Sequence, residues 1–413
     1  MFGTTFKRRA LRYLAVLGPG LVVMFADTEA GSITTAAASG ARFGFKMILL
    51  QLLLIVPLFV VQEMTVRLGT ITGKGHAYLI REHYGIGWAW VSLGTMLVTN
   101  VAALVTEFAG IAGAAKIFGL PSAPLVVTAA GLLGIVIFTR SYKRAEVFAL
   151  ALCAIELLFI PGALAAHPAL HDVVETGIFG AQPLGDRTYL LLIASNIGAV
   201  IMPWMIFYQQ SAVVDKRLGP GDLGYARLDT AIGSVLTQWI MIAIVATTGA
   251  TLFVHHVHVS DASQAALALQ PLLGRMAGVT FGAGLIGASM LGAFVVSIAT
   301  AWGFGEAFGW RHSLNDGIRA KRFSALYLVC IFVAAGVVLI PGLPLVSLTI
   351  DVEAFNGFVL PIVLVFLLFL VNDRRIVGER RNGPLANVIT VGLSIGIVAL
   401  GAWMAIATLF HPA

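Results

Sequence analysis

The chain has 413 residues, of which 59% are hydrophobic and only 11% are charged, with a formal net charge of +6. Soluble proteins carry roughly 25% charged residues, so this composition excludes a soluble globular protein and predicts a polytopic membrane protein. The lipid bilayer is therefore the first expected partner.

Eleven hydrophobic stretches are long enough to cross a bilayer, which takes about 20 helical residues. No soluble domain stands between them, so a single transmembrane domain is expected over residues 1–413. The predicted spans are about 13–40, 45–68, 87–115, 120–139, 145–166, 188–213, 229–254, 278–304, 323–341, 346–371 and 384–409.

The basic residues predict the orientation of these spans. The N-terminal segment and the even-numbered gaps contain 21 of the 26 Lys and Arg residues. The protein is expected in the cell membrane (plasma or inner membrane). Because cytoplasmic loops carry an excess of Lys and Arg, its N-terminus is expected on the cytoplasmic side and its C-terminus on the outer side. Orientation thus accounts for the positive charge, and no nucleic-acid partner is expected.

Two acids lie in the middle of the first span, at Asp27 and Glu29. Ionisable groups at that depth are energetically unfavourable and usually mark a binding site or pathway. On an unbroken helix, residues two apart point to different faces, so one acid would meet lipid. Small and polar neighbours, including Gly31 and Ser32, favour an unwound segment that turns both acids inward. A kinked helix with structurally paired acids is the alternative.

The sixth span contains a second break signal, Gly198 followed by Pro203. Proline removes a helix donor and clashes with a carbonyl one turn back. If residues about 13–166 and about 188–371 form two halves of five spans, the breaks in spans one and six correspond, and the halves insert with opposite topology. Paired interrupted helices of this kind indicate a transporter site. The stretch 384–409 is then an extra helix.

Other polar residues within the spans are candidates for supporting or coupling roles. Glu107 in span three and Asp351 and Glu353 in span ten are predicted intramembrane acids. Asn196 is more simply explained as an interhelical hydrogen-bonding residue. Glu353 is alternatively placed near a membrane surface.

Three stretches resemble the natural resistance-associated macrophage protein (NRAMP) family of divalent metal transporters. The first runs from Gly18-Pro19-Gly20 through Glu29-Ala30-Gly31-Ser32 to Arg42-Phe43-Gly44-Phe45. The second is Thr106-Glu107-Phe108-Ala109-Gly110, and the third is Gly198-Ala199-Val200-Ile201-Met202-Pro203-Trp204. The resemblance implies an all-α, LeuT-like fold of about 11 helices, with an inverted 5+5 repeat and broken helices 1 and 6.

The same resemblance implies a set of ion ligands. It places Glu29 at the family's metal-binding Asp, Ser32 at its Asn, Met202 at its thioether ligand and Ala199 at its backbone-carbonyl ligand. Trp204 and Gln209 stand where the family has His residues, and Gly110 replaces an acid of the third helix. The chain is therefore similar to the divergent branch of NRAMP-related magnesium transporters, and weakened or absent proton coupling is expected.

The leading hypothesis is a secondary active or facilitative transporter of Mg²⁺ or Mn²⁺ that works by alternating access, with no resident cofactor and no enzyme activity. Oxygen donors from Asp27, Glu29, Ser32, Gln209 and the carbonyls near Ala199 suit a hard cation. The thioether of Met202 favours a softer metal, and packing is an equal alternative for it. The second hypothesis is a small polar organic solute or anion, carried with a proton on Glu29 or Asp27. Oligomeric state is left open.

Overall fold

The computed structural model describes residues 12–410, apart from residues 14, 258, 260–261 and 342–348. All regular structure in this part of the chain is helical. The α-helices are α2 (Pro19–Phe25), α3 (Ala30–Phe43), α4 (Ile48–Thr72), α5 (His76–Tyr84), α6 (Ile86–Ile117), α7 (Ser122–Val136), α8 (Tyr142–Glu156), α9 (Phe159–Ala165), α10 (Leu170–Gly177), α11 (Arg187–Val200), α12 (Pro203–Asp215), α13 (Leu223–Thr248), α14 (Ala262–Leu273), α15 (Arg275–Phe308), α16 (Lys321–Val338), α17 (Thr349–Asn372), α18 (Arg374–Val377) and α19 (Pro384–Phe410).

Ten helical stretches of the described chain are long and apolar enough to cross a membrane. The broken pair α2–α3 provides the eleventh predicted span, and each of the eleven predicted stretches corresponds to one observed helix or helix pair. Several boundaries differ by a few residues, and two of these differences concern a charged residue. Helix α4 continues past Arg67 to Thr72, and α13 starts at Leu223, before Asp229. Both charged residues had been placed at span ends, but each is buried with polar partners inside the protein.

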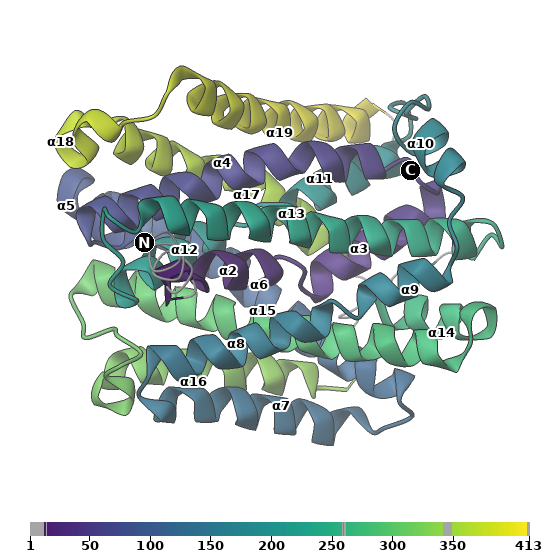
Figure 1. Cartoon of the computed structure of the whole chain (residues 1–413), viewed down its shortest axis with the longest axis horizontal. Coiled ribbons are helices and arrows are strands. Elements are labelled where there is room, and N and C mark those ends of the chain that lie inside the picture. Colours follow the sequence, from purple (N-terminus) through teal and green to yellow (C-terminus); the bar gives the residue numbers. More distant parts are fainter. Residues whose placement is uncertain (1–11, 14, 258, 260–261, 342–348, 411–413) are drawn as a thin grey trace, which may run out of the picture.

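The long helices lie side by side along the longest axis of the molecule (Figure 1). Helices α5 and α18 lie at one end of this bundle and α10 and α14 at the other. Helix α15 packs along α6, α17 along α11, and α13 along α2, α3 and α4. Among the ten long stretches α15 is the most deeply buried and α19, at the edge of the bundle, the least.

The first span is interrupted where the sequence predicted. Pro19 occupies the first turn of α2, which ends at Phe25. The amides of Asp27 and Thr28 then bond three residues back, to the carbonyls of Met24 and Phe25, at 3.2 and 2.8 Å. Glu29 is extended, and α3 begins at Ala30. The chain between the two helices therefore leaves the regular hydrogen-bond ladder for about one turn.

The sixth span is interrupted in the same manner. Helix α11 ends at Val200, Ile201 and Met202 have extended backbones, and Pro203 occupies the first turn of α12. The Ser32 hydroxyl donates to the carbonyl oxygen of Ala199 at 3.0 Å, so the start of α3 contacts the end of α11 directly. The two breaks are thus brought together in the centre of the bundle.

Candidate functional site

Four acidic side chains from three transmembrane segments meet at the first break. Asp27 and Glu29 belong to the break itself, Glu107 to α6 and Glu353 to α17, and each is at most 1% exposed. Glu29 lies within hydrogen-bonding range of both Glu107 and Glu353. Two carboxyl groups form such a bond only when one of them carries a proton, because an ionised carboxylate has no donor. We call these four residues the acid cluster.

Among the described residues, no buried base neutralises the acid cluster. Within residues 12–410, as far as the structure describes them, none of the four forms an ion pair with a Lys or Arg. When the four acids are all ionised, the carboxyl oxygens of Asp27 and of Glu29 have no hydrogen-bond donor among the described residues. Burying an unpaired carboxylate is strongly unfavourable, so the acid cluster requires protons or a cation from outside the chain.

Short polar contacts fix the positions of these acids. The amide of Ala30 donates to Glu107 at 3.3 Å, and the side-chain amide of Asn356 donates to Glu353 at 3.1 Å. A Cβ atom on Gly31 would lie 2.1 Å from Oε1 of Glu353. Glycine at the start of α3 therefore permits the close approach of Glu353, since any side chain there would displace the carboxyl group.

The second break supplies a carbonyl but not a free thioether. Ala199 presents its carbonyl oxygen to Ser32 on α3. The sulfur of Met202 accepts a hydrogen bond from the indole nitrogen of Trp204 at 2.9 Å, and both side chains are buried. The resemblance placed Trp204 at a histidine position. Its indole here donates a hydrogen bond to the Met202 sulfur.

Asn196 and Gln209 lie outside the acid cluster. Asn196 accepts from Gln51 of α4 at 2.6 Å and donates to Ser39 of α3 at 2.9 Å, so it joins three helices, as the interhelical interpretation predicts. Gln209 donates to Thr230 of α13 at 3.2 Å, and the Thr230 amide lies beside Gly20 of α2. Gln209 therefore lies towards the start of α2, away from the break that contains Asp27 and Glu29.

Asp351 and Glu353 have opposite environments, which corrects the expectation that both are buried intramembrane acids. Asp351 is exposed in the first turn of α17, whereas Glu353 is fully buried. Residues two apart on a helix point to different faces, so only one of the pair can face the acid cluster. Glu353 lies against Gly31 and Glu29 at the first break, in the interior of the bundle.

Three residues of the site were not among those predicted for it. Glu156, the last residue of α8, is buried without a donor among the described residues and lies close enough to Asp27 for the two charges to interact. The sequence alone leaves two roles equally open for Glu156, an intramembrane functional acid or a structural partner of an arginine. Asn356 stands one turn after Glu353, a spacing that was available in the sequence. Thr237 of α13 bonds Thr28 at 2.6 Å, and no local pattern indicates that contact.

The described residues contain no group of three or more His, Cys, Asp and Glu side chains arranged to hold a metal ion. A cation at the break would therefore take one or two carboxylates together with hydroxyl, carbonyl and water oxygens. That donor set is the one by which Mg²⁺ is usually bound, because this ion dehydrates reluctantly.

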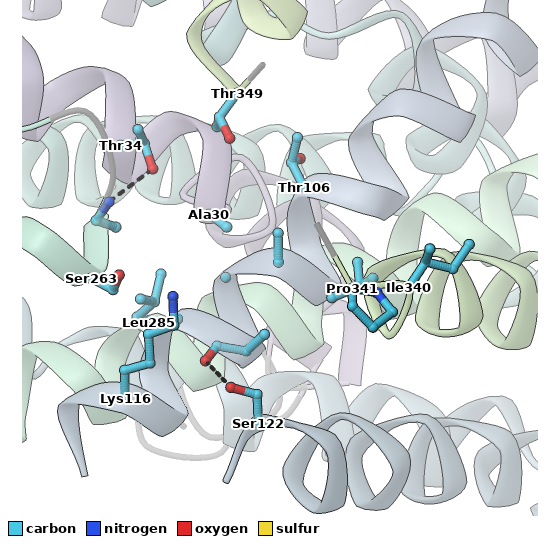
Figure 2. A pocket seen from close by; sticks show the side chains of 16 residues that line it. Ala30, Thr34, Thr106, Lys116, Ser122, Ser263, Leu285, Ile340, Pro341 and Thr349 are labelled. Carbon is cyan, nitrogen blue, oxygen red and sulfur yellow. Dashed lines mark hydrogen bonds between the residues drawn. The ribbon is translucent and has the colours of Figure 1, made fainter. Parts of the chain in front are cut away.

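A cavity of about 280 Å³ reaches Ala30, the residue that follows Glu29 (Figure 2). Its lining includes the hydroxyl residues Thr34, Thr106, Ser122, Ser263 and Thr349, together with Gly110. Among the described residues that line it, Lys116 is the only charged one, and Figure 2 shows that side chain extending into the space between the hydroxyls. We call this space the outer vestibule, because the distribution of basic residues predicts that this end of the bundle faces outward.

Charged side chains attach the start of α2 to the neighbouring helices. Asp229 of α13 accepts from the amides of Gly18 and Gly20 at 3.1 and 2.8 Å. Lys216 donates to the carbonyl of Leu17 at 2.8 Å and to Glu146 of α8 at 2.7 Å. These contacts, which we call the inner latch, attach the start of α2 to α8, α12 and α13.

Two discontinuous helices that cross at buried polar groups in an eleven-span bundle are the architecture of a secondary membrane transporter. The family model described as "Natural resistance-associated macrophage protein-like" matches residues 20–407. The chain belongs to this family of metal-ion transporters, and it is a multi-pass membrane protein, not an enzyme.

Solved structures with the same fold support the architecture. A manganese transporter from Eremococcus coleocola is 18% identical, with a TM-score of 0.67 over 95% of this chain and 94% of that chain. MhsT in complex with L-phenylalanine is 14% identical, with a TM-score of 0.60 over 94% and 98%. A Na⁺-coupled sialic acid symporter is 14% identical, with a TM-score of 0.55 over 100% and 98%. At these identities the likeness concerns the fold alone, and it confirms the predicted LeuT-like class.

Proposed function

We propose that this protein carries a hard divalent cation, Mg²⁺ or Mn²⁺, across the membrane by alternating access, and that it binds the ion at the first break. The observation that carries the proposal is the acid cluster: four buried carboxyl groups, with no Lys or Arg paired to them in the described chain. Two ionised carboxylates neutralise a doubly charged ion, which lowers the electrostatic penalty of holding it in a low-dielectric interior.

The proposed ligands are the carboxylates of Asp27 and Glu29, with the oxygens of Ser32 and Ala199 nearby and water completing the shell. Glu107 and Glu353 contact Glu29 and support it. The Met202 thioether is occupied by the Trp204 indole, so the donors left for the ion are oxygens. An all-oxygen set favours Mg²⁺ or Mn²⁺ over softer transition metals.

Proton coupling is proposed to be weak or absent. Gly110 and Gln209 cannot titrate, and they stand where the family resemblance placed ionisable groups. If coupling nevertheless occurs, Glu107 and Glu353 are the groups to carry the proton, because both lie against Glu29. Uptake of Mg²⁺ or Mn²⁺ into liposomes that contain a pH-sensitive dye separates these cases. We expect no metal-dependent acidification of the lumen, and a clear acidification would contradict weak coupling.

The test of cargo is uptake of Mg²⁺, Mn²⁺ and Ca²⁺ into proteoliposomes, with binding followed by isothermal titration. We expect saturable uptake by the wild type and its loss in Glu29→Ala, because one of the two proposed carboxylate ligands is removed. The matched pair is Glu353→Ala and Asp351→Ala: the first alters a buried neighbour of Glu29 and the second an exposed acid two residues away. Uptake should fall in the first and stay within two-fold of wild type in the second.

The alternative cargo is a small polar organic solute or anion. One observation favours it: the outer vestibule offers hydroxyl groups and one lysine, Lys116, and this positive charge attracts anions and repels cations. Absence of uptake for all three cations, in liposomes where the protein is folded and correctly inserted, would favour this second function.

A further inference from the structure

A second charged cavity lies at the other end of the bundle, away from the acid cluster. It has a volume of about 380 Å³ and is lined by four arginines: Arg67 of α4, Arg227 of α13, and Arg380 and Arg381, which precede α19. Leu223, the first residue of α13, forms part of its wall. The cavity, which we call the arginine pocket, therefore lies between two transmembrane helices and the segment that leads into the last one.

The positive charge of the arginine pocket is only partly neutralised. Glu63 is shared by two of the arginines, at 3.1 Å from Arg67 and 2.6 Å from Arg227. Arg380 and Arg381 form no ion pair within the described chain. The neighbouring acids are already engaged: Asp222 with Arg12, Asp373 with Arg375, and Glu379 with Arg374. Four guanidinium groups thus face a single carboxylate.

Arg67 supplies a second, independent sign of a missing anion. Its guanidinium donates to the carbonyl of Arg380 at 2.8 Å and to the side chain of Asn382, and the residue is only 6% exposed. Its Nε, however, is buried and has no acceptor among the described residues. A buried donor on a charged group is strongly unfavourable when left unpaired, so an acceptor from outside the described chain is expected here.

We propose that the arginine pocket binds a phosphate group, either on the headgroup of an anionic lipid or on a soluble phosphate compound. Guanidinium groups match phosphate oxygens through paired, charge-assisted hydrogen bonds. The pocket lies at the end of the bundle that the basic residues assign to the cytoplasm, where basic pockets between membrane helices take anionic headgroups. A bound phosphate would connect α4, α13 and the segment before α19, and this role does not depend on the transported cargo.

The experiment is native mass spectrometry of the purified full chain with added phosphatidylglycerol or phosphatidylcholine, with and without inorganic phosphate. We expect the wild type to bind phosphatidylglycerol at least ten-fold more tightly. Arg380→Gln/Arg381→Gln should weaken that binding by roughly ten-fold or more, since each arginine near a membrane surface contributes about 1 kcal/mol. The charge-matched control is Arg374→Gln/Arg375→Gln, whose arginines are outside the pocket and already paired; it should change binding less than three-fold.

The outcomes separate the two sources of phosphate. In the first outcome, millimolar inorganic phosphate displaces the lipid and raises the melting temperature of the wild type but not of Arg380→Gln/Arg381→Gln. The pocket then accepts soluble phosphate. In the second outcome only the lipid binds, and the pocket is a headgroup site. Arg227→Gln, at the exposed rim, repeats the test should the double variant fail to fold. Equal binding of the two lipids without a phosphate effect, or equal losses in both double variants, would overturn the proposal.

Discussion

The two ends of the broken first span have different surroundings. At the start of α3, next to Glu29, the outer vestibule reaches Ala30 and is lined mainly by small and hydroxyl residues. At the start of α2, a cavity of about 520 Å³ is lined by Glu146 and Lys216 of the inner latch and by Ala15, twelve positions before Asp27. Among the described residues, the outer vestibule therefore reaches a direct chain neighbour of the acid cluster, Ala30.

The start of α2 is held in place by specific polar contacts. The inner end is held by a buried acid at two backbone amides and by an ion pair. Alternating access needs one end to open as the other closes. If the protein works by alternating access, as proposed above, the inner latch consists of the contacts that must break when the inner end opens.

The largest expected effect comes from blocking the vestibule. Ala109 lines it and is half-buried, so Ala109→Cys should react with a membrane-impermeant thiol reagent added outside, and uptake should fall more than ten-fold. The background variant Cys153→Ala/Cys330→Ala removes the native thiols. Uptake into right-side-out vesicles before and after labelling measures the effect.

Ala15→Cys is the matched control, because Ala15 is exposed in the inner cavity. It should be modified only when the reagent has access to the inner side. Labelling of Ala15→Cys from outside, together with protection of Ala109→Cys, would reverse the assigned orientation.

Breaking the inner latch should have the next largest effect. Lys216 and Glu146 are each about one-tenth exposed, at 11% and 10%, so removing one partner leaves a largely buried charge. Lys216→Met should lower the free energy of unfolding in detergent by about 3–5 kcal/mol. The double variant Lys216→Met/Glu146→Leu should recover most of that loss. A double variant no more stable than the single one would show that the pair is not the closing contact.

Local sequence signals predicted both breaks but not the contacts across the bundle. The acids beside Gly31 and the proline at position 203 are local signals, so the interruptions were visible in the chain alone. The structure adds that Gly31 and Gly198 also make room for α17. Whether Glu156 meets an arginine or Asp27 depends on the packing of α8 against α2, which no local pattern encodes. The same holds for Asp351 and Glu353, because the rotation of α17 decides which of them is buried.

A smaller change is expected at Asp229. Asp229→Asn keeps one side-chain oxygen for the amides of Gly18 and Gly20 but loses the negative charge. Hydrogen bonds to charged groups contribute about 1.5–3 kcal/mol and neutral ones about 1 kcal/mol, so we expect a loss of about 1 kcal/mol in unfolding free energy. Denaturant unfolding measures it, with exposed Asp186→Asn as a control at the other end of the bundle.

The smallest effect is a pH dependence confined to the inner end. His76 at the start of α5 is buried 3.1 Å from the side-chain oxygen of Gln210, and burial lowers its pKa to about 4. The unfolded chain, with a histidine pKa near 6.5, therefore binds the proton first as pH falls. His76 stabilises the fold fully above about pH 6.5, and this contribution is lost as pH falls towards 4.

Between pH 7.5 and pH 6 the loss should be about 0.8 kcal/mol. His76→Gln, which keeps a hydrogen-bonding side chain, should flatten the pH dependence of the melting temperature over this interval. Identical slopes for the two proteins would show that burial does not lower the pKa of His76.

The most direct measurement is the anomalous diffraction of crystals grown with Mn²⁺. The account predicts a peak at the first break, beside the carboxylates of Asp27 and Glu29, at about 2.0–2.4 Å from their oxygens. The peak should be absent in Glu29→Gln crystals grown under the same conditions. A peak at the Met202 sulfur or in the outer vestibule, with none at the acid cluster, would contradict the central claim.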